Sequence, residues 1–233
     1  MKNIIGSVEQ TVVQPTQAEK LPVRKFHPLI EALTKKWRLN QNHVDYDTVS
    51  YCLTDRLNVL NDLFGGREDS FDKLSGKKIL DLGCGSRYTY DNMIGFVSYV
   101  MYEPWLCRAL NELGAFPTGI DFNSLDGEPF NHQVVDLSLK GALDFLSTSS
   151  FDAINSRFLL GADCASFSPT FERIVVERDA RVDSEVKVKE MKEEFMQQAL
   201  RLLKEGGVFV FEAEAFRKIN NRLEQVNLKY AIM

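Results

Sequence analysis

The sequence predicts an α/β fold in which a mostly parallel, doubly wound sheet carries helices on both faces and follows an N-terminal helical extension. Two patterns indicate this fold. Short apolar segments of strand length alternate with longer stretches in which apolar residues recur every three or four positions. A turn with two closely spaced glycines follows the first of the short segments. Strands that alternate with helices form right-handed βαβ units, and such units build a parallel sheet.

The chain is predicted to have three parts. Residues 1–25 contain few large apolar residues and are predicted to be a flexible lead-in. Residues 26–70 form the helical extension, which packs on the core, and residues 71–233 form the main domain. A chain of 233 residues is long enough for one α/β domain with such an appendage.

Two helices are predicted within the extension. Pro28 suits the first position of a helix, and apolar residues at spacings of four continue the pattern over about residues 28–38. A second helix begins after an aspartate cap, follows apolar residues at intervals of three and four, and ends at Gly65 and Gly66. We expect both helices to lie across the sheet or over its binding site.

Five strands and two further helices follow. One helix begins after Pro104 and ends at Gly114, and another carries apolar residues from Met191 to Leu202 on one face. About twenty residues follow the fifth strand, enough for a helix and one short strand over residues 228–233, so the sheet edge is expected to be incomplete. The predicted strands cover residues 79–82, 117–121, 132–137, 151–156 and 206–212.

The glycine turn is the strongest functional signal in the chain. A buried strand from Ile79 to Leu82 leads into Gly83 and Gly85, which let the backbone pass close to a ligand without a Cβ atom in the way. A dinucleotide site would have a third glycine three residues after the second, where Tyr88 stands. The alternative is a tight strand-to-helix connection that binds no ligand.

Polar residues stand at or near the ends of four predicted strands. Asp81 lies near the end of the first strand, Asp121 and Asp136 near the ends of the second and third, and Asn155 near the end of the fourth. In a parallel sheet, ligands bind outside the carboxyl ends of the strands. These side chains and the glycine turn are therefore predicted to form one site. The alternative for each aspartate at a strand end is to cap the next helix.

These motifs resemble the class I S-adenosylmethionine-dependent methyltransferases, which have a Rossmann-like sheet. The resemblance covers roughly residues 76–212. It is carried by Lys-Ile-Leu-Asp-Leu-Gly-Cys-Gly-Ser, Thr-Gly-Ile-Asp-Phe, Val-Val-Asp-Leu, Phe-Asp-Ala-Ile-Asn-Ser and Leu-Leu-Lys-Glu-Gly-Gly-Val-Phe-Val. It implies the cofactor S-adenosyl-L-methionine. The cofactor-binding residues that it implies are Asp81, Gly83, Cys84, Gly85, Asp121, Phe122, Asp136, Leu137, Asn155 and Ser156.

The resemblance also implies a role for each segment. The turn with Asp81, Gly83 and Gly85 would hold the methionine part of the cofactor. Asp121 would accept hydrogen bonds from both ribose hydroxyls, a task that suits a carboxylate. Phe122 would lie against the face of the adenine ring.

The later strands would complete the implied site. Asp136 would accept a hydrogen bond from the adenine amine, with Leu137 beside it at the adenine edge. Asn155 and Ser156 would line the cofactor and open toward the methyl acceptor.

The chain departs from the family pattern after the turn. Arg87 stands where a further glycine is common, and residues 86–102 separate the turn from the next helix. This insertion is rich in aromatic residues, and we expect it to form part of the acceptor pocket, with Tyr88 and Tyr90 as substrate-binding residues. The alternative is a local hydrophobic core for the insertion.

Composition and charge argue against several classes of partner. A net charge of −5 and a pI of about 5.4 give no overall basic field, which disfavours nucleic acid. The four cysteines lack the spacing of a metal site, so no metal is expected, and they suggest reduced thiols in a cytoplasmic protein. No apolar stretch approaches the roughly 18 residues that span a bilayer, so no membrane partner is expected.

The sequence therefore predicts an enzyme that moves a methyl group by in-line displacement to a small-molecule acceptor. Positioning and exclusion of water can suffice for this reaction, so no catalytic residue is assigned. The alternatives are a protein that binds S-adenosylmethionine or a nucleoside without transfer, and a nicotinamide-dependent oxidoreductase. An incomplete sheet edge would fit a truncated chain, a divergent edge, or an edge covered by the N-terminal helices or by a partner such as a second copy of the chain.

Overall fold

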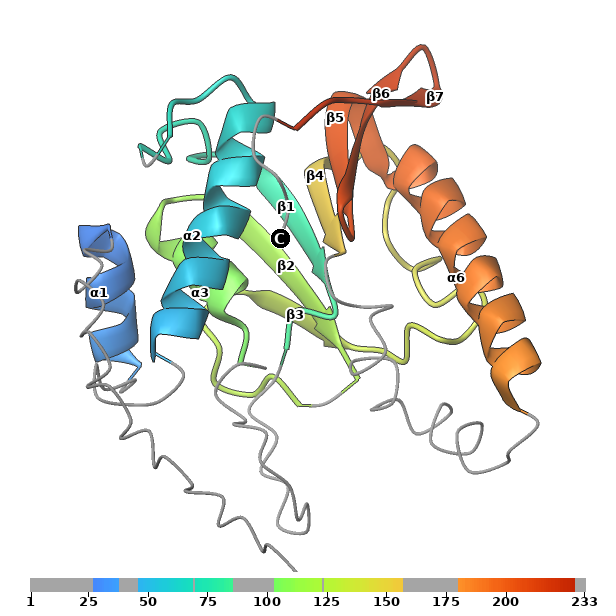
Figure 1. Cartoon of the computed structure of the whole chain (residues 1–233), viewed down its shortest axis with the longest axis horizontal. Helices are drawn as coiled ribbons and strands as arrows, with labels where there is room; N and C mark the ends of the chain where they lie inside the picture. The colour runs from blue at the N-terminus through green and yellow to red at the C-terminus, as the bar shows by residue number, and fades with distance from the viewer. Residues whose placement is uncertain are drawn as a thin grey trace, which may run out of the picture.

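The protein folds around one seven-stranded sheet with the strand order β3-β2-β1-β4-β5-β6-β7 (Figure 1). Strands β1 to β5 pair in parallel, and β6 and β7 pair antiparallel. This arrangement is consistent with the Rossmann-like α/β fold that the sequence predicts. In Thr48 and residues 180–188 only the backbone is described. The computed structural model describes residues 27–37, 46–68, 70–85, 103–122, 124–156 and 180–228.

The first five observed strands follow the predicted segments, except that β3 ends earlier and β5 begins earlier than expected. Strand β3 ends at Val134, so Asp136 lies in the turn that follows and not in the strand. Val135 still donates its backbone N–H to the carbonyl oxygen of Asp121, at 2.8 Å. The strands are β1 Lys78–Leu82, β2 Phe116–Asp121, β3 Asn131–Val134, β4 Phe151–Ser156, β5 Leu203–Phe211, β6 Glu214–Ile219 and β7 Arg222–Gln225.

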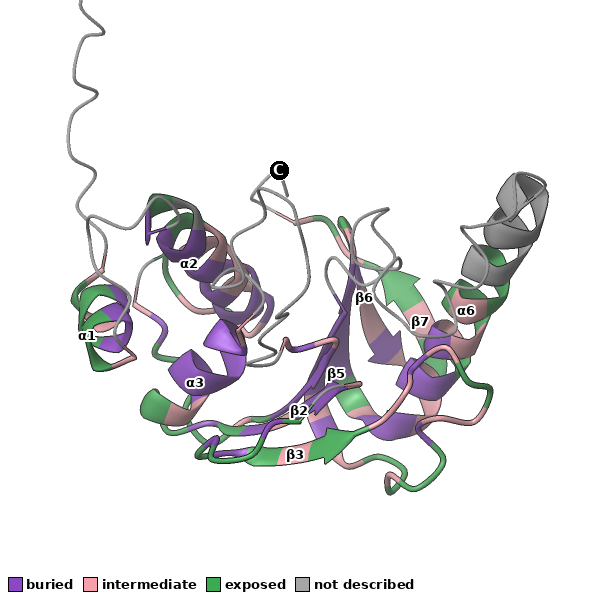
Figure 2. Ribbon diagram, turned by 90° about the horizontal axis from the view of Figure 1, so that it is seen from below, coloured by how far each residue is buried: buried purple, intermediate pink, exposed green. Residues whose placement is uncertain are grey.

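Helices cover both faces of the sheet (Figure 2). Because side chains alternate along a strand, Ile79 of β1 packs with α1, α2 and α3, whereas Leu80 and Leu82 pack on the face that α6 covers. One hydrophobic core therefore lies on each side of the sheet. The two helices expected before β1 are present, and both contribute to the first core. The helices are α1 Pro28–Lys36, α2 Tyr46–Leu63, α3 Trp105–Glu112 and α6 Ala180–Leu202.

The C-terminal edge of the sheet corrects one expectation. In place of a helix and a short final strand, residues after β5 form two antiparallel strands, β6 and β7. Asn220 and Asn221 join them with φ angles of 50° and 57°, as a two-residue hairpin turn requires. Asparagine tolerates this conformation, so the turn signal was present in the sequence and was missed. The edge is built by this hairpin, and association of two copies through it stays a prediction.

Two basic side chains of β6 join the hairpin to a helix on each face. Arg217 donates to the carbonyl oxygen of Leu63, the last residue of α2. Lys218 is buried, and its Nζ donates to the carbonyl oxygens of Leu200, near the end of α6, and of Leu203, the first residue of β5. Cations suit these positions because the last carbonyl groups of a helix lack partners inside the helix and carry partial negative charge.

Several predicted features lie outside the described residues. They are the lead-in over residues 1–25, the insertion over 86–102 with Tyr88 and Tyr90, and the part of the predicted final strand over 229–233. None of the described helices has the length and apolar character that a membrane span requires.

Candidate functional site

The glycine turn leaves the carboxyl end of β1 and is fixed by its neighbour β2. Gly83 and Gly85 have φ angles of 67° and 89°, which residues with a Cβ atom disfavour. The backbone N–H groups of Gly83 and Cys84 both donate to the carbonyl oxygen of Ile120, at 2.8 and 3.1 Å. The backbone conformation of the turn therefore favours glycine at both positions.

Asp121 ends β2 and reaches the glycine turn. Its Oδ2 atom accepts a hydrogen bond from the backbone N–H of Gly85 at 3.0 Å, and the residue is 7% exposed. A carboxylate can accept several hydrogen bonds at once. Asp121 can therefore hold the turn and bind a further donor at the same time. The structure thus brings together the acid and the turn that the sequence predicts to share a site.

Asp81 and Asn155 form a buried pair across β1 and β4. The Nδ2 atom of Asn155 donates to Oδ1 of Asp81 at 2.6 Å, and the Cys107 thiol lies 3.6 Å from Oδ2 of the same carboxyl. Each of the two paired residues is 1% exposed. Burial raises the pKa of the Asp81 carboxyl above its ordinary value, while the charge of Arg56 on α2 acts in the opposite direction. Asp81 therefore holds the ends of β1 and β4 together beneath the turn.

The raised pKa of Asp81 predicts how stability depends on pH. The pKa of this carboxyl in the folded state lies above its ordinary value of 3.8, which applies in the unfolded chain. The stabilising contribution of the group is therefore present below pH 3.8 and is lost as the pH rises through the folded-state pKa. In Asp81→Asn the amide oxygen can still accept from Asn155, but nothing titrates. We expect the free energy of unfolding of the wild type, measured in urea, to fall relative to that of Asp81→Asn as the pH rises from about 3.

Asp126→Asn makes the same change of charge at an exposed position and serves as the matched control. Parallel stability curves for the wild type and Asp81→Asn across the acid range would show that burial does not shift the pKa of this carboxyl.

Two thiols and two apolar side chains pack beneath the turn. Cys84, Cys107, Leu125 and Phe130 form a small buried cluster. Gly119 of β2 lies against it, because a Cβ atom at this position would be 2.8 Å from the sulfur of Cys84 and 2.8 Å from the Phe130 ring. Burial raises the pKa of the Cys107 thiol well above its ordinary value, which keeps it protonated. Sequence reasoning missed Gly119, because its constraint comes from residues distant in the chain.

Asp136 and Leu137 lie just after β3, and their implied contacts with the adenine stay a prediction. Oδ1 of Asp136 accepts from the backbone N–H of Ser138 at 2.9 Å and from its hydroxyl at 2.6 Å, so this atom stabilises the turn after β3. Leu137 is buried in the core under α6. For Asp136 the alternative was a helix cap. Its side chain does accept from the backbone at the start of the next element, but that element is a turn and not a helix.

Phe122 and Ser156 lie at the carboxyl ends of β2 and β4. Phe122 follows Asp121 directly and is half-buried. Ser156 ends β4, and its buried hydroxyl has no hydrogen-bond partner within the part of the chain that the structure describes. Because side chains alternate along β4, Ser156 points to the α6 face and Asn155 to the opposite one.

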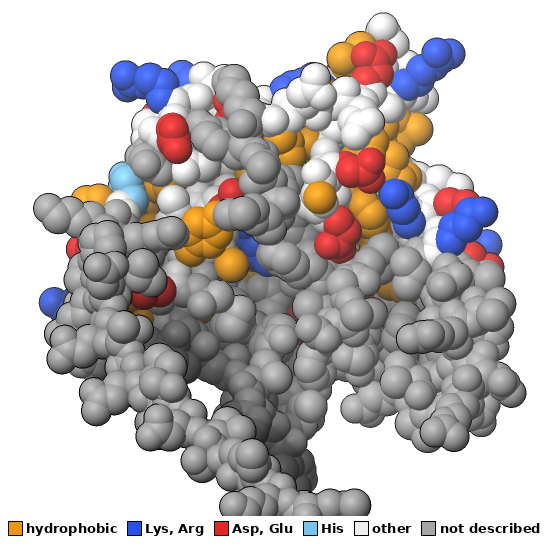
Figure 3. Space-filling view, in the orientation of Figure 1, with side chains coloured by type: hydrophobic (Ala, Val, Ile, Leu, Met, Phe, Trp, Pro, Cys, Tyr) orange, Lys and Arg blue, Asp and Glu red, His pale blue; other side chains and the backbone are white. Residues whose placement is uncertain are grey.

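Two features concern the charged side chains of the described residues: their spread over one face and whether acidic ones gather as a metal site would require. Basic and acidic side chains are interspersed over the described part of the face in Figure 3. Within the described ranges, no three His, Cys, Asp or Glu side chains gather as a metal site would require.

No protein-family model and no curated protein sequence matches this chain. A solved structure of the CurJ carbon methyltransferase has 14% sequence identity and a TM-score of 0.37, over 79% of this chain and 40% of that chain. A structure of the trans-methyltransferase CalH with SAH has 13% identity and a TM-score of 0.33, over 78% of this chain and 43% of that chain. This chain thus spans less than half the length of either protein, and similarity at this level does not establish a function.

Proposed function

We propose that the chain is an S-adenosylmethionine-dependent methyltransferase with its cofactor site at the carboxyl ends of β1, β2 and β4. The observation that carries this proposal is the 3.0 Å hydrogen bond between Asp121 and Gly85, which joins the acid at the end of β2 to the glycine turn after β1. In the family that the motifs resemble, these two elements hold the ribose and the methionine part of the cofactor.

The donor and acceptor groups of the site fit this cofactor. S-adenosylmethionine carries an ammonium, a sulfonium and a ribose diol but no phosphate, so it suits carboxylates and backbone groups. The Asp121 carboxylate would accept from the two ribose hydroxyls, and the lack of a Cβ atom at Gly83 and Gly85 would allow a ligand close to the backbone. A dinucleotide would be expected to have a third glycine where Tyr88 stands.

In this proposal the residues of the site bind and orient the cofactor. Asp81 and Asn155 fix the strand ends that carry the turn, and Asp121 orients the ribose. The bound cofactor supplies an electrophilic methyl group. The acceptor is proposed to be a small molecule beside the insertion that contains Tyr88 and Tyr90. In-line displacement needs alignment of acceptor and methyl group and exclusion of water, so no general base is assigned.

Isothermal titration calorimetry with S-adenosylmethionine, S-adenosylhomocysteine and NADH tests the proposal. We expect the first two to bind one per chain in the micromolar range and NADH to give no binding heat. Incubation with methyl-labelled S-adenosylmethionine and the low-mass fraction of a cell extract should then give a labelled small molecule. Binding without label transfer would assign a cofactor-binding protein, and binding of NADH alone would contradict the proposal.

A further inference from the structure

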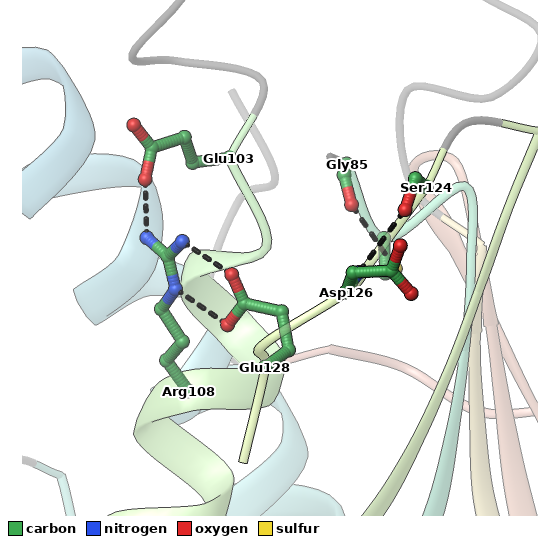
Figure 4. A network of polar contacts seen from close by, with 7 residues as sticks. Gly85, Glu103, Arg108, Ser124, Asp126 and Glu128 are labelled. Carbon is green, nitrogen blue, oxygen red and sulfur yellow. Dashed lines mark hydrogen bonds and ion pairs between the residues drawn. The ribbon is translucent and has the colours of Figure 1, made fainter. Parts of the chain in front are cut away.

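Arg108 of α3 is the largest side chain that is completely buried among the described residues. Its Nε and Nη2 atoms donate to the two carboxylate oxygens of Glu128, at 3.0 and 2.6 Å, and Nη1 donates to Glu103. Figure 4 shows Arg108 reaching from α3 to both glutamates, with the segment from Ser124 to Glu128 running from this cluster toward Gly85. The cluster thus contains one cation and two carboxylates.

Two indole rings pack against the same guanidinium. Its central carbon lies 3.9 Å from the ring centroid of Trp37, which follows α1, and 5.0 Å from that of Trp105 in α3. Arginine over the face of tryptophan is a favourable cation–π contact, and more so when the pair is desolvated. Arg108 therefore contacts four parts of the chain: the end of α1, the start of α3, the segment before α3, and the connection from β2 to β3.

The connection from β2 to β3, residues 122–130, borders the proposed cofactor site. It begins directly after Asp121, and Leu125 and Phe130 pack with Cys84 of the glycine turn. The side chain of Glu128 in this connection is 1% exposed, so its contact with Arg108 is an internal one. On the other side of Arg108, Glu103 precedes Pro104 at the start of α3, and it is the first described residue after the insertion.

A buried ion cluster is better suited to fixing geometry than to adding stability. Removing charged groups from water offsets much of their attraction, and an apolar contact of similar size often stabilises a fold as well. A two-pronged arginine–carboxylate contact, in contrast, fixes both the distance and the direction between its partners. The contact between Arg108 and Glu128 therefore sets where the connection from β2 to β3 lies relative to α3.

We propose that Arg108 is a positioning residue for the cofactor site, acting through Glu128 to hold residues 122–130 in place. Phe122, the neighbour of Asp121, is the residue of this connection that is proposed to lie against the adenine. The inference rests on the proposed function, because it concerns binding at the same site. The Glu103 contact serves the start of α3 and is expected to matter less for binding.

The test compares conservative variants by S-adenosylhomocysteine calorimetry and by hydrogen exchange of residues 122–130. Glu128→Gln removes the charge but keeps the size of the side chain, and we expect its Kd to rise about tenfold. Hydrogen exchange in residues 122–130 should be faster in this variant. Arg108→Lys keeps the charge but loses the two-pronged contact, and should behave in the same way. In Glu103→Gln the Kd should stay within about twofold of the wild type.

Lys218→Met is the control for a loss of stability alone, because Lys218 is buried on β6 and ties the end of α6. It should lower the Tm and leave the Kd unchanged. The inference is wrong if the Kd of Glu128→Gln and Arg108→Lys stays at the wild-type value, or if Lys218→Met weakens binding equally. A wild-type protein that does not bind S-adenosylhomocysteine would instead contradict the proposed function, and with it this inference.

Discussion

Replacing Asp121 with asparagine is expected to weaken S-adenosylhomocysteine binding by about 100-fold, because hydrogen bonds from two ribose hydroxyls to a carboxylate contribute about 3 kcal/mol together. The asparagine carbonyl oxygen can still accept from the backbone N–H of Gly85, which now donates to Asp121 at 3.0 Å. The glycine turn should therefore persist, and the Tm should change little. Calorimetry together with thermal unfolding measures both quantities.

Two further variants separate binding from folding at this position. Asp121→Ala removes the acceptor for Gly85 as well, so it should lose binding and also lower the Tm. Asp126→Asn makes the same change of charge at an exposed position of the adjacent connection and should bind normally. Unchanged binding in Asp121→Asn would show that Asp121 only supports the glycine turn and does not contact the ribose.

Replacing Gly119 with alanine is expected to lower the free energy of unfolding by about 1–3 kcal/mol through overpacking. The added Cβ atom would lie 2.8 Å from the sulfur of Cys84 and from the Phe130 ring, and 3.3 Å from the sulfur of Cys107. These groups lie beneath the glycine turn, so they cannot move outward without displacing it. Urea denaturation measures the loss, and S-adenosylhomocysteine binding should weaken in parallel.

A double-mutant cycle identifies the contact that causes this loss. Cys84→Ala removes one of the two sulfur atoms near the added methyl group, so Gly119→Ala should be less destabilising in the Cys84→Ala background. If Gly119→Ala has the same effect in both backgrounds, or less than about 0.5 kcal/mol in the wild type, the packing beneath the turn is looser than the structure indicates.

The parts of the site that the sequence predicts are those with a local signal. Gly83 and Gly85 follow a short apolar strand, and their positive φ angles explain why glycine stands at both positions. The aspartate near the end of each early strand is also visible, because the carboxyl ends of parallel strands share one edge of the sheet. This reasoning predicts that Asp121 lies near the turn, and in the structure it accepts a hydrogen bond from Gly85. It placed Asp136 at a strand end, whereas β3 stops earlier and Asp136 begins a turn.

Features that depend on contacts between distant residues were missed. In the sequence Gly119 looks like any glycine in a strand. Only the structure shows that Cys107 and Phe130 pack against it. Arg108 and Glu128 resemble ordinary surface charges, and no spacing in the sequence shows that their side chains meet in the interior. The C-terminal hairpin is a different case, because Asn220 and Asn221 were a turn signal within the chain.

A crystal structure of the chain with S-adenosylhomocysteine tests the central claim most directly. We predict that the two ribose hydroxyls lie within hydrogen-bond distance of the Asp121 carboxylate and that the amino-acid part of the ligand lies along the turn at Gly83 and Gly85. A ligand bound away from the carboxyl ends of β1 and β2, or no bound ligand at a saturating concentration, would contradict the proposed site.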